Sequence, residues 1–535
     1  MSKTENKRSL GTGAIFVALG IFLSRIAGLF RDKVFAYYFG SSAAGDVFRA
    51  ALRIPNFLQN LLGEGVLSGS FIPIYGRLLG EKRPEEAREL AGAVFAVLAI
   101  LTTLLVSSGV LATPWLIDLI APGFEGDRRE LCIQLVRILF PGIGLLVLSA
   151  FCLGVLNSHR KFFLSYVAPV LWNAAIIATL LIRGPGTEQE RLVILTGWGV
   201  VIGCALQLAV QVPTVMKLLR GIPFHLSTAV FQAGSQLRAV ITNFIPIVTA
   251  RGVVQISAYL DTVMASFLPI GALSVLGYAQ TLYLLPVSLF GMSISAAELP
   301  AMSQETGSDR EIADALRKRI VSACRRISIF IIPTVAAFVF LGPLILKILY
   351  RGGAFDAETS RLVWFVLIGS TLGILATTQS RIFSSSFYAL RDARTPLRIA
   401  IVRVLLSTGL GATLAFFGPG LFGLDASYGT IGLTTGFGIS SWVEWLMLKR
   451  SLEKRVGSIG LPIAHAARSW TAALVPAVSI FALLFRNPDW TDSFLGAGAL
   501  LAVYGASYLV LAVALRIEEV SELVRRQILR RFRIS

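Results

Sequence analysis

Charged side chains lie inside two strongly apolar stretches, residues 11–39 and 44–76. A charge inside an apolar helix costs roughly 2.5–3.5 kcal/mol on insertion scales, so it must face a partner or a water-filled cavity. The charged residues are Arg25, Arg31, Asp32 and Lys33 in the first stretch, and Asp46, Arg49, Arg53 and Glu64 in the second. A planar guanidinium group binds phosphate oxygens in pairs, so an arginine-rich cavity at membrane depth suits a pyrophosphate group.

The spacing of the charges in the second stretch places them on one side of a helix. Asp46 and Arg49 are three residues apart, and Arg49 and Arg53 are four apart, so all three share a face. Arginines outnumber carboxylates across the two stretches, which favours an anion site. The alternative is that the arginines pair with the neighbouring carboxylates and only hold helices together.

Other charges within apolar stretches are isolated. Arg251 and Asp261 share one stretch, whereas Arg381 and Arg403 lie alone in two others. Asp261 is a candidate cation-coupling or proton-coupling residue, or else the structural partner of Arg251 or Arg403.

The composition indicates the elements that must position these charges. Of the 535 residues, 55% are hydrophobic and 15% are charged, against about 25% charged in a typical soluble protein. Apolar stretches recur along the whole chain, and each is long enough to cross a hydrocarbon core of about 30 Å. We predict an all-α polytopic membrane protein with about 14 transmembrane helices. The fourteen stretches are 11–39, 44–76, 91–119, 131–156, 162–183, 191–216, 238–268, 271–300, 320–350, 361–388, 396–417, 422–448, 465–485 and 494–516.

The net charge of +18 is concentrated in alternate loops. Lys and Arg accumulate on the cytoplasmic side of membrane proteins, so the alternation places both termini in the cytoplasm. An even number of helices requires the same result. Binding of the basic loops to nucleic acid is the weaker alternative. The basic loops lie near residues 3–8, 77–88, 160–161, 217–220, 310–319, 391–394, 449–455 and 525–533.

The chain also carries a weak internal repeat. Phe124 and Phe355 are 231 residues apart, and each follows a glycine-containing loop and precedes an apolar stretch. The repeat predicts two six-helix lobes around a central cavity, both in the same membrane orientation. The predicted parts are an N-terminal lobe (1–220), a C-terminal lobe (235–455), two further helices (465–516) and a basic cytoplasmic tail (517–535), which reads as an amphipathic helix resting on anionic lipid.

The sequence contains no recognisable catalytic constellation. The four cysteines show no metal-ligand spacing, and the three histidines are scattered. There is no phosphate-cradling loop, nucleotide fold or long exterior loop to carry a catalytic site. We therefore expect no enzymatic activity, no cofactor and no metal centre, and a membrane glycosyltransferase or polymerase is the less favoured class. A non-transporting scaffold is disfavoured by the charges at membrane depth.

Two sequence runs carry a resemblance to a known family. "LSRIAGLFRDKVFAYYFG" and the following "DVFRAALRIPNFLQNLLGEGVLSGSFIPIYGRL" closely resemble the start of the MurJ (MviN) lipid II flippases of the MOP exporter superfamily. Further matches are "APGF" at 121–124, "RGGAF" at 351–355 and "FYALRDARTP" at 387–396. Fourteen helices in two lobes is also the architecture of that family.

The resemblance implies a flippase of peptidoglycan biosynthesis in the bacterial inner membrane. Its substrate would be lipid II, linked to undecaprenyl pyrophosphate and translocated by alternating access; membrane lipids and cell-wall synthesis proteins are the other implied partners. The alternative is export of another polyprenyl-linked oligosaccharide or another substrate of the superfamily. Family positions with functional weight correspond to Arg25, Arg31, Asp46, Glu64 and Ser274.

The chain departs from the family at two expected cations. The family commonly has arginine where this chain has Gln59 and Thr281. Arg49, Arg53 or Arg251 is a candidate to supply the missing positive charge. Together with Asp32 beside Arg31, these residues complete the predicted substrate site.

Overall fold

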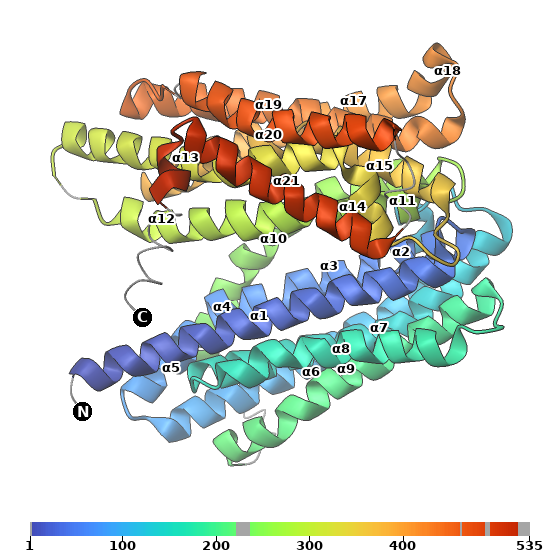
Figure 1. Ribbon diagram of the computed structural model, residues 1–535. Coiled ribbons are helices and arrows are strands. Elements are labelled where there is room, and N and C mark those ends of the chain that lie inside the picture. Colours follow the sequence, from blue (N-terminus) through green and yellow to red (C-terminus); the bar gives the residue numbers. More distant parts are fainter. Residues whose placement is uncertain (1–2, 221–235, 306, 461–462, 487–492, 523–535) are drawn as a thin grey trace. The chain divides into compact units, whose positions relative to one another are not determined.

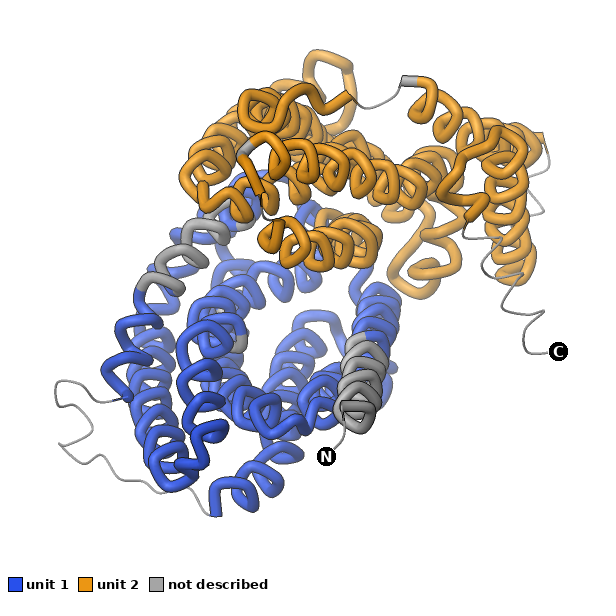
Figure 2. Tube along the Cα trace, turned by 90° about the vertical axis from the view of Figure 1, so that its left-hand side faces the viewer, with its two compact units in different colours: residues 1–274 blue, residues 275–535 orange. Residues whose placement is uncertain are grey.

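The computed structural model describes residues 3–220, 236–305, 307–460, 463–486 and 493–522, which are almost entirely helical (Figure 1). The chain divides into two compact units, residues 1–274 and 275–535 (Figure 2). The first unit contains α1 (Lys3–Phe39), α2 (Ala43–Ala51), α3 (Arg53–Leu62), α4 (Glu64–Ser70), α5 (Ile72–Gly80), α6 (Pro84–Ile120), α7 (Gly126–Ser158), α8 (Phe162–Arg183), α9 (Gln189–Leu219) and α10 (Gln236–Ser266).

Helix α11 (Ala272–Pro286) runs across the boundary between the units. The second unit continues with a π-helical segment, η2 (Val287–Met292), and a 3-10 turn, η3 (Ala426–Tyr428). Its other helices are α12 (Ser293–Ser303), α13 (Asp309–Phe340), α14 (Gly342–Leu349), α15 (Ala357–Thr371), α16 (Ile374–Ala389), α17 (Arg394–Phe416), α18 (Gly418–Phe422), α19 (Gly429–Val456), α20 (Ile463–Arg486) and α21 (Phe494–Ala514).

The predicted fold class is confirmed. Ten helices in the described part of the chain are long and apolar enough to cross a membrane. Boundaries agree closely where the apolar stretch is uninterrupted: residues 162–183 were predicted and α8 spans Phe162–Arg183. Helix α6 begins at Pro84, inside the predicted basic loop 77–88 and seven residues before the predicted apolar stretch.

The predicted stretch 44–76 is not one helix but the four short helices α2 to α5. Gly63, between α3 and α4, has extended backbone (φ −85°, ψ −153°), and a Cβ there would lie 2.2 Å from the carbonyl oxygen of Gln59. A residue with a side chain cannot occupy that position without a shift of the backbone. Pro73 lies in the first turn of α5, where its missing N–H leaves no helical bond unmade.

Contacts within the first unit place α10 with the helices that precede it. Helix α10 packs against α3, α4 and α6, while α8 packs between α1 and α9. The compact unit therefore ends after α10, at residue 274. The predicted lobes, 1–220 and 235–455, follow the sequence repeat instead and stay a prediction.

The internal repeat has a structural counterpart in two turns. Arg160 follows α7 and Arg391 follows α16, again 231 residues apart, and both have a φ of 59°. The N–H of Lys161 donates to the Leu156 carbonyl, and the N–H of Asp392 donates to the Phe387 carbonyl, each at 2.9 Å. The same hydrogen-bonded turn thus recurs at the same offset as the sequence repeat.

Where a residue other than glycine has left-handed backbone in the described part of the chain, it is basic and follows a helix. The non-glycine residues with positive φ there are Lys82, Arg160, Arg220, Arg391 and Arg516, and each follows the C-terminus of a helix. Glycine or asparagine is the usual choice at such positions. A basic side chain is instead favoured electrostatically, because the C-terminal end of a helix carries partial negative charge.

Two tyrosines of α21 fasten that helix to α13. Pro333 interrupts α13 and has no N–H, so the Ile329 carbonyl four residues earlier loses its helical donor. The Tyr508 hydroxyl donates to this carbonyl at 2.7 Å, and the Tyr504 hydroxyl donates to the Pro333 carbonyl at 2.7 Å. Ile517, just after α21, is buried in the same cluster. The rest of the predicted basic tail, residues 523–535, lies outside the described residues.

Replacing Tyr508 with Phe should lower the free energy of unfolding by about 1–3 kcal/mol, because the Ile329 carbonyl is left without a partner. The matched control is Tyr504→Phe, since the Pro333 carbonyl can still accept from the N–H of Ala337. Thermal unfolding of both variants in detergent checks the difference. Equal losses in the two variants would contradict the role given to Tyr508.

His159, at the end of α7, should make stability depend on pH. Burial lowers the pKa of its imidazole below the ordinary value near 6.5, and its Nε2 lies 2.9 Å from the Tyr75 hydroxyl. Because the folded state binds the proton less readily than the unfolded state, the stabilisation is present above about pH 6.5 and is lost as the pH falls below it. His159→Gln should show a smaller loss between pH 7 and 5 in thermal unfolding; identical pH profiles would refute this.

Candidate functional site

Helix α1 presents an arginine and a carboxylate side by side. Arg31 donates from Nη2 and Nε to Asp32 Oδ1 at 2.8 and 3.1 Å. Its guanidinium also lies 5.0 Å from the ring centre of Trp172 on α8. Asp32 is 4% exposed, so the pair is held away from solvent on one side. Arg31 is therefore oriented by its neighbour rather than free to rotate.

Asp46 on α2 is a buried anchor for the start of α11. Its Oδ2 accepts the N–H of Gly271 at 2.7 Å, and its Oδ1 accepts the N–H of Ser274 at 2.8 Å. Arg128 of α7 adds an ion pair at 3.5 Å, and the Asp46 residue is fully buried. A carboxylate that accepts the first N–H groups of a helix satisfies donors that the helix itself cannot pair. Ser274, a predicted site residue, meets Asp46 through its backbone N–H.

Two arginines and a carboxylate come together where α2, α3 and α10 meet. The charge of Asp261 attracts the Arg53 guanidinium, and the charge of Arg49 repels it. Arg49 lies over the ring of Phe35, with its Cζ 5.2 Å from the ring centre. The Tyr259 hydroxyl of α10 donates to the Arg53 carbonyl at 3.0 Å and so fixes the start of α3. Among the residues whose side chains the structure describes, this cluster includes Arg49, Arg53 and Asp261.

An apolar cavity of about 550 Å³ adjoins the same helices. It is lined by side chains of α3, α6, α7 and α10, among them Ile54, Phe57 and Tyr259. Ile54 directly follows Arg53, so the apolar lining begins one residue from the charged cluster. The first unit therefore offers guanidinium groups and an apolar surface close together, which suits an amphiphile with an anionic headgroup.

The remaining predicted site residues have different surroundings. Arg25 on α1 is exposed. Glu64 and Arg251 have side chains outside the described residues. Thr281, at a departure from the family, donates to the Gly277 carbonyl of its own helix at 3.0 Å and supplies no charge.

Sequence reasoning missed two charged partners. Arg128 was not singled out, although it lies opposite Asp46. In the second unit, Arg403 Nε lies 3.3 Å from Glu444 of α19, and its guanidinium faces the Phe437 ring at 5.6 Å. Glu444 lies within the predicted stretch 422–448, so its charge inside an apolar run was the available signal. Arg403 thus has a carboxylate partner within its own unit, and the pairing of Asp261 with Arg251 or Arg403 stays a prediction.

Comparison with solved structures defines the class. An inward-facing multidrug resistance MATE family transporter of the MOP superfamily matches with a TM-score of 0.61, at 15% identity over 83% of this chain and 98% of that chain. A structure of lipid II flippase MurJ in an inward closed conformation matches with a TM-score of 0.76, at 24% identity over 95% of this chain and 100% of that chain. The chain has the fold of these multi-pass membrane transporters.

Sequence comparison then identifies the family. The model of the family described as "Lipid II flippase MurJ" matches residues 35–501. The lipid II flippase MurJ of Burkholderia cenocepacia is 30% identical over 88% of this chain and 89% of its own length. A probable lipid II flippase MurJ of Aquifex aeolicus is 26% identical over 98% of both chains. The chain belongs to the MurJ family, whose members are multi-pass proteins of the inner membrane.

Replacing Asp46 with Asn should lower the free energy of unfolding by about 1–2 kcal/mol, because asparagine offers one acceptor oxygen to two backbone donors. The matched control is Asp118→Asn, which breaks an exposed ion pair with Arg129 of 2.7 Å and should change stability by less than about 1 kcal/mol. Thermal unfolding in detergent measures both. If the Asp46→Asn variant were as stable as the control variant, the hydrogen bonds of Asp46 to the start of α11 would not be needed for stability.

Proposed function

We propose that this chain translocates lipid II across the inner membrane by alternating access, without enzymatic chemistry. The support is its membership of the MurJ family, together with the arginines that lie beside an apolar cavity in the first unit. Arg25, Arg31 and Arg53, with Arg49 next to them, neutralise the diphosphate, while the polyprenyl chain stays in lipid. Guanidinium groups suit this role because they pair with phosphate oxygens through two parallel hydrogen bonds.

The carboxylates have supporting roles in this proposal. Asp32 orients Arg31, and Asp46 fixes the beginning of α11. Asp261 accompanies Arg53 in the absence of substrate. When a diphosphate takes its place beside Arg53, Asp261 is released and can accept a proton or a cation, which makes it the candidate ion-coupling residue. Glu64, Arg251 and Ser274 complete the proposed site on the strength of the family resemblance.

The orientation and partners belong to the same proposal. The basic loops place both termini in the cytoplasm. Cell-wall synthesis proteins are the proposed further partners. Nothing in the described residues favours a different polyprenyl-linked glycan. This chain has Gln59 and Thr281 where the family commonly has arginine, and Arg49 and Arg53 supply two positive charges in the first unit.

A double-mutant comparison separates substrate binding from helix pairing. Arg53→Gln should reduce the appearance of lipid II at the outer face by at least about tenfold, the effect of losing one charge-assisted contact. If the only role of Arg53 is to pair with Asp261, the double variant Arg53→Gln with Asp261→Asn should regain activity, because no unpaired charge is left. We expect the double variant to stay inactive.

The assay is lipid II accessibility at the outer face in cells depleted of their own flippase. Arg183→Gln, at the end of α8, is the exposed control and should retain full activity. Thermal unfolding confirms that each variant is folded. Recovery of translocation in the double variant would assign Arg53 to helix pairing and overturn the proposed site. Arg25→Ala and Arg31→Ala test the α1 arginines in the same assay.

A further inference from the structure

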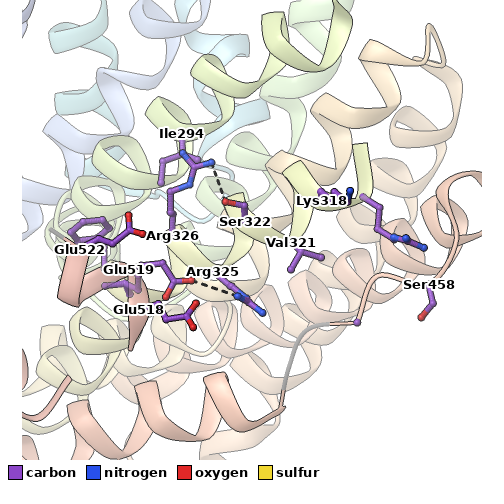
Figure 3. A pocket seen from close by; sticks show the side chains of 14 residues that line it. Ile294, Lys318, Val321, Ser322, Arg325, Arg326, Ser458, Glu518, Glu519 and Glu522 are labelled. Carbon is purple, nitrogen blue, oxygen red and sulfur yellow. Dashed lines mark hydrogen bonds and ion pairs between the residues drawn. The ribbon is translucent and has the colours of Figure 1, made fainter. Parts of the chain in front are cut away.

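A cavity of about 860 Å³ lies within the second unit, on the side of α13 that faces the chain after α21 (Figure 3). Helix α13 supplies one wall, with residues spaced three or four apart along a single face. The opposite wall comes from the segment after α19 and from residues that follow α21. The α13 residues are Arg317, Lys318, Val321, Ser322, Arg325, Arg326, Ile329 and Phe330.

One end of the cavity carries charges of both signs. Arg325 of α13 lies beside Glu518 and Glu519 of the segment after α21, Glu522 lies near them, and Lys318 lies on the far side of Arg325 from these carboxylates. Arg325 Nη1 and Glu519 Oε1 are 4.0 Å apart, too far for a hydrogen bond. Arg325 Nε and Glu519 Oε2 are buried atoms without a hydrogen-bond partner in the described structure. Both signs of charge therefore retain unused hydrogen-bonding capacity.

Two other arginines of this wall are already committed. Arg326 donates to Glu298 at 2.6 Å and Arg317 lies 2.9 Å from Asp314. These pairs leave Arg325 as the α13 cation beside Glu518 and Glu519, with Lys318 further along the same wall and His465 Nδ1 3.9 Å from Glu519 Oε2. A ligand that carries only negative charge would bring its anion against Glu518 and Glu519 as well.

The rest of the lining is largely apolar, although Arg326 and Glu522 lie on the same side as Ile294. Ile294, Ile329 and Phe330 belong to this part, and Phe330 is stacked on Phe290 with ring centres 4.4 Å apart. Lys318 and Phe330 are separated by about 18 Å along the helix axis. The charged end lies at the level where α19 ends, α20 begins and α21 ends, which is the level expected for the membrane surface. The lining thus changes from charged to apolar in the direction of the bilayer.

We propose that this cavity binds phosphatidylethanolamine from the surrounding membrane. Its phosphodiester would lie between Lys318 and Arg325, its primary ammonium would donate to Glu518 and Glu519, and its acyl chains would follow Ile329 and Phe330. A phosphatidylcholine headgroup has no N–H to donate to the carboxylates, and a phosphatidylglycerol headgroup has no cation to offer them. The site is separate from the proposed lipid II residues, all of which lie at or before residue 274.

Native mass spectrometry of the full chain with added palmitoyl-oleoyl lipids tests the proposal. The wild-type protein should bind phosphatidylethanolamine at least about fivefold better than phosphatidylcholine or phosphatidylglycerol, the effect of one charged hydrogen bond. Glu519→Gln should abolish this preference while the protein still binds all three lipids. Arg325→Gln should weaken all three, and Glu518→Gln provides an independent second variant. Arg77→Gln and Glu81→Gln, which break an exposed ion pair at the end of α5 in the first unit, are the matched controls.

Three results would overturn the inference. The first is equal binding of the three lipids to the wild-type protein. The second is stronger binding of phosphatidylglycerol than of phosphatidylethanolamine. The third is that Glu519→Gln and Arg325→Gln bind the three lipids with the same affinities as the control variants. Soluble glycerophosphoethanolamine is added as a competitor to distinguish a lipid site from a site for the free headgroup. Competition only at a concentration at least about a hundredfold above that of the lipid supports the apolar end of the site, and competition at equal concentration would refute it.

Discussion

The need to satisfy every charge and backbone group away from water explains most of the specific contacts in this protein. Hydrocarbon offers no hydrogen bonds, so each buried ionic or peptide group must find a partner inside the protein. Asp46 meets this demand with two backbone N–H groups and an arginine. Arg403 meets it with Glu444 and an aromatic face. Such contacts fix neighbouring helices to one another.

The same demand gives α20 and α21 a structural role. Long helices with an internal proline expose a carbonyl that must be paired, and α13 has its carbonyl paired by Tyr508 of α21. The apolar cluster that joins α13, α20 and α21 includes both tyrosines of that helix. These last two helices therefore complete α13 rather than merely lie beside it. The cavity proposed to bind phospholipid lies at the end of the same arrangement, where the charged part of α13 begins.

Much of the fold could be predicted from apolar runs, since a stretch such as residues 162–183 becomes a helix with the same limits. The break of residues 44–76 into four helices could not, because apolar character continues across Gly63 while the backbone turns. The charged residues of the site could be predicted, because a charged residue within an apolar run is easily recognised in the sequence. Their partners were not: Asp46 bonds to Gly271, 225 residues away, and no local spacing reveals such a contact. Glu444 was visible in principle, as a lone carboxylate in an apolar stretch.

The basic residues with left-handed backbone after helices α5, α7, α9, α16 and α21 bear on how the chain is inserted. Glycine would relieve the backbone at each of these five turns, so in the folded protein backbone strain opposes the attraction of a basic side chain to the helix C-terminus. During insertion, however, the same side chains bias which loops remain on the side of synthesis. A turn that closes a helix thereby also serves as a topological signal. A basic residue at these turns therefore carries backbone strain, and against it stand the attraction to the helix C-terminus and the bias on loop placement during insertion.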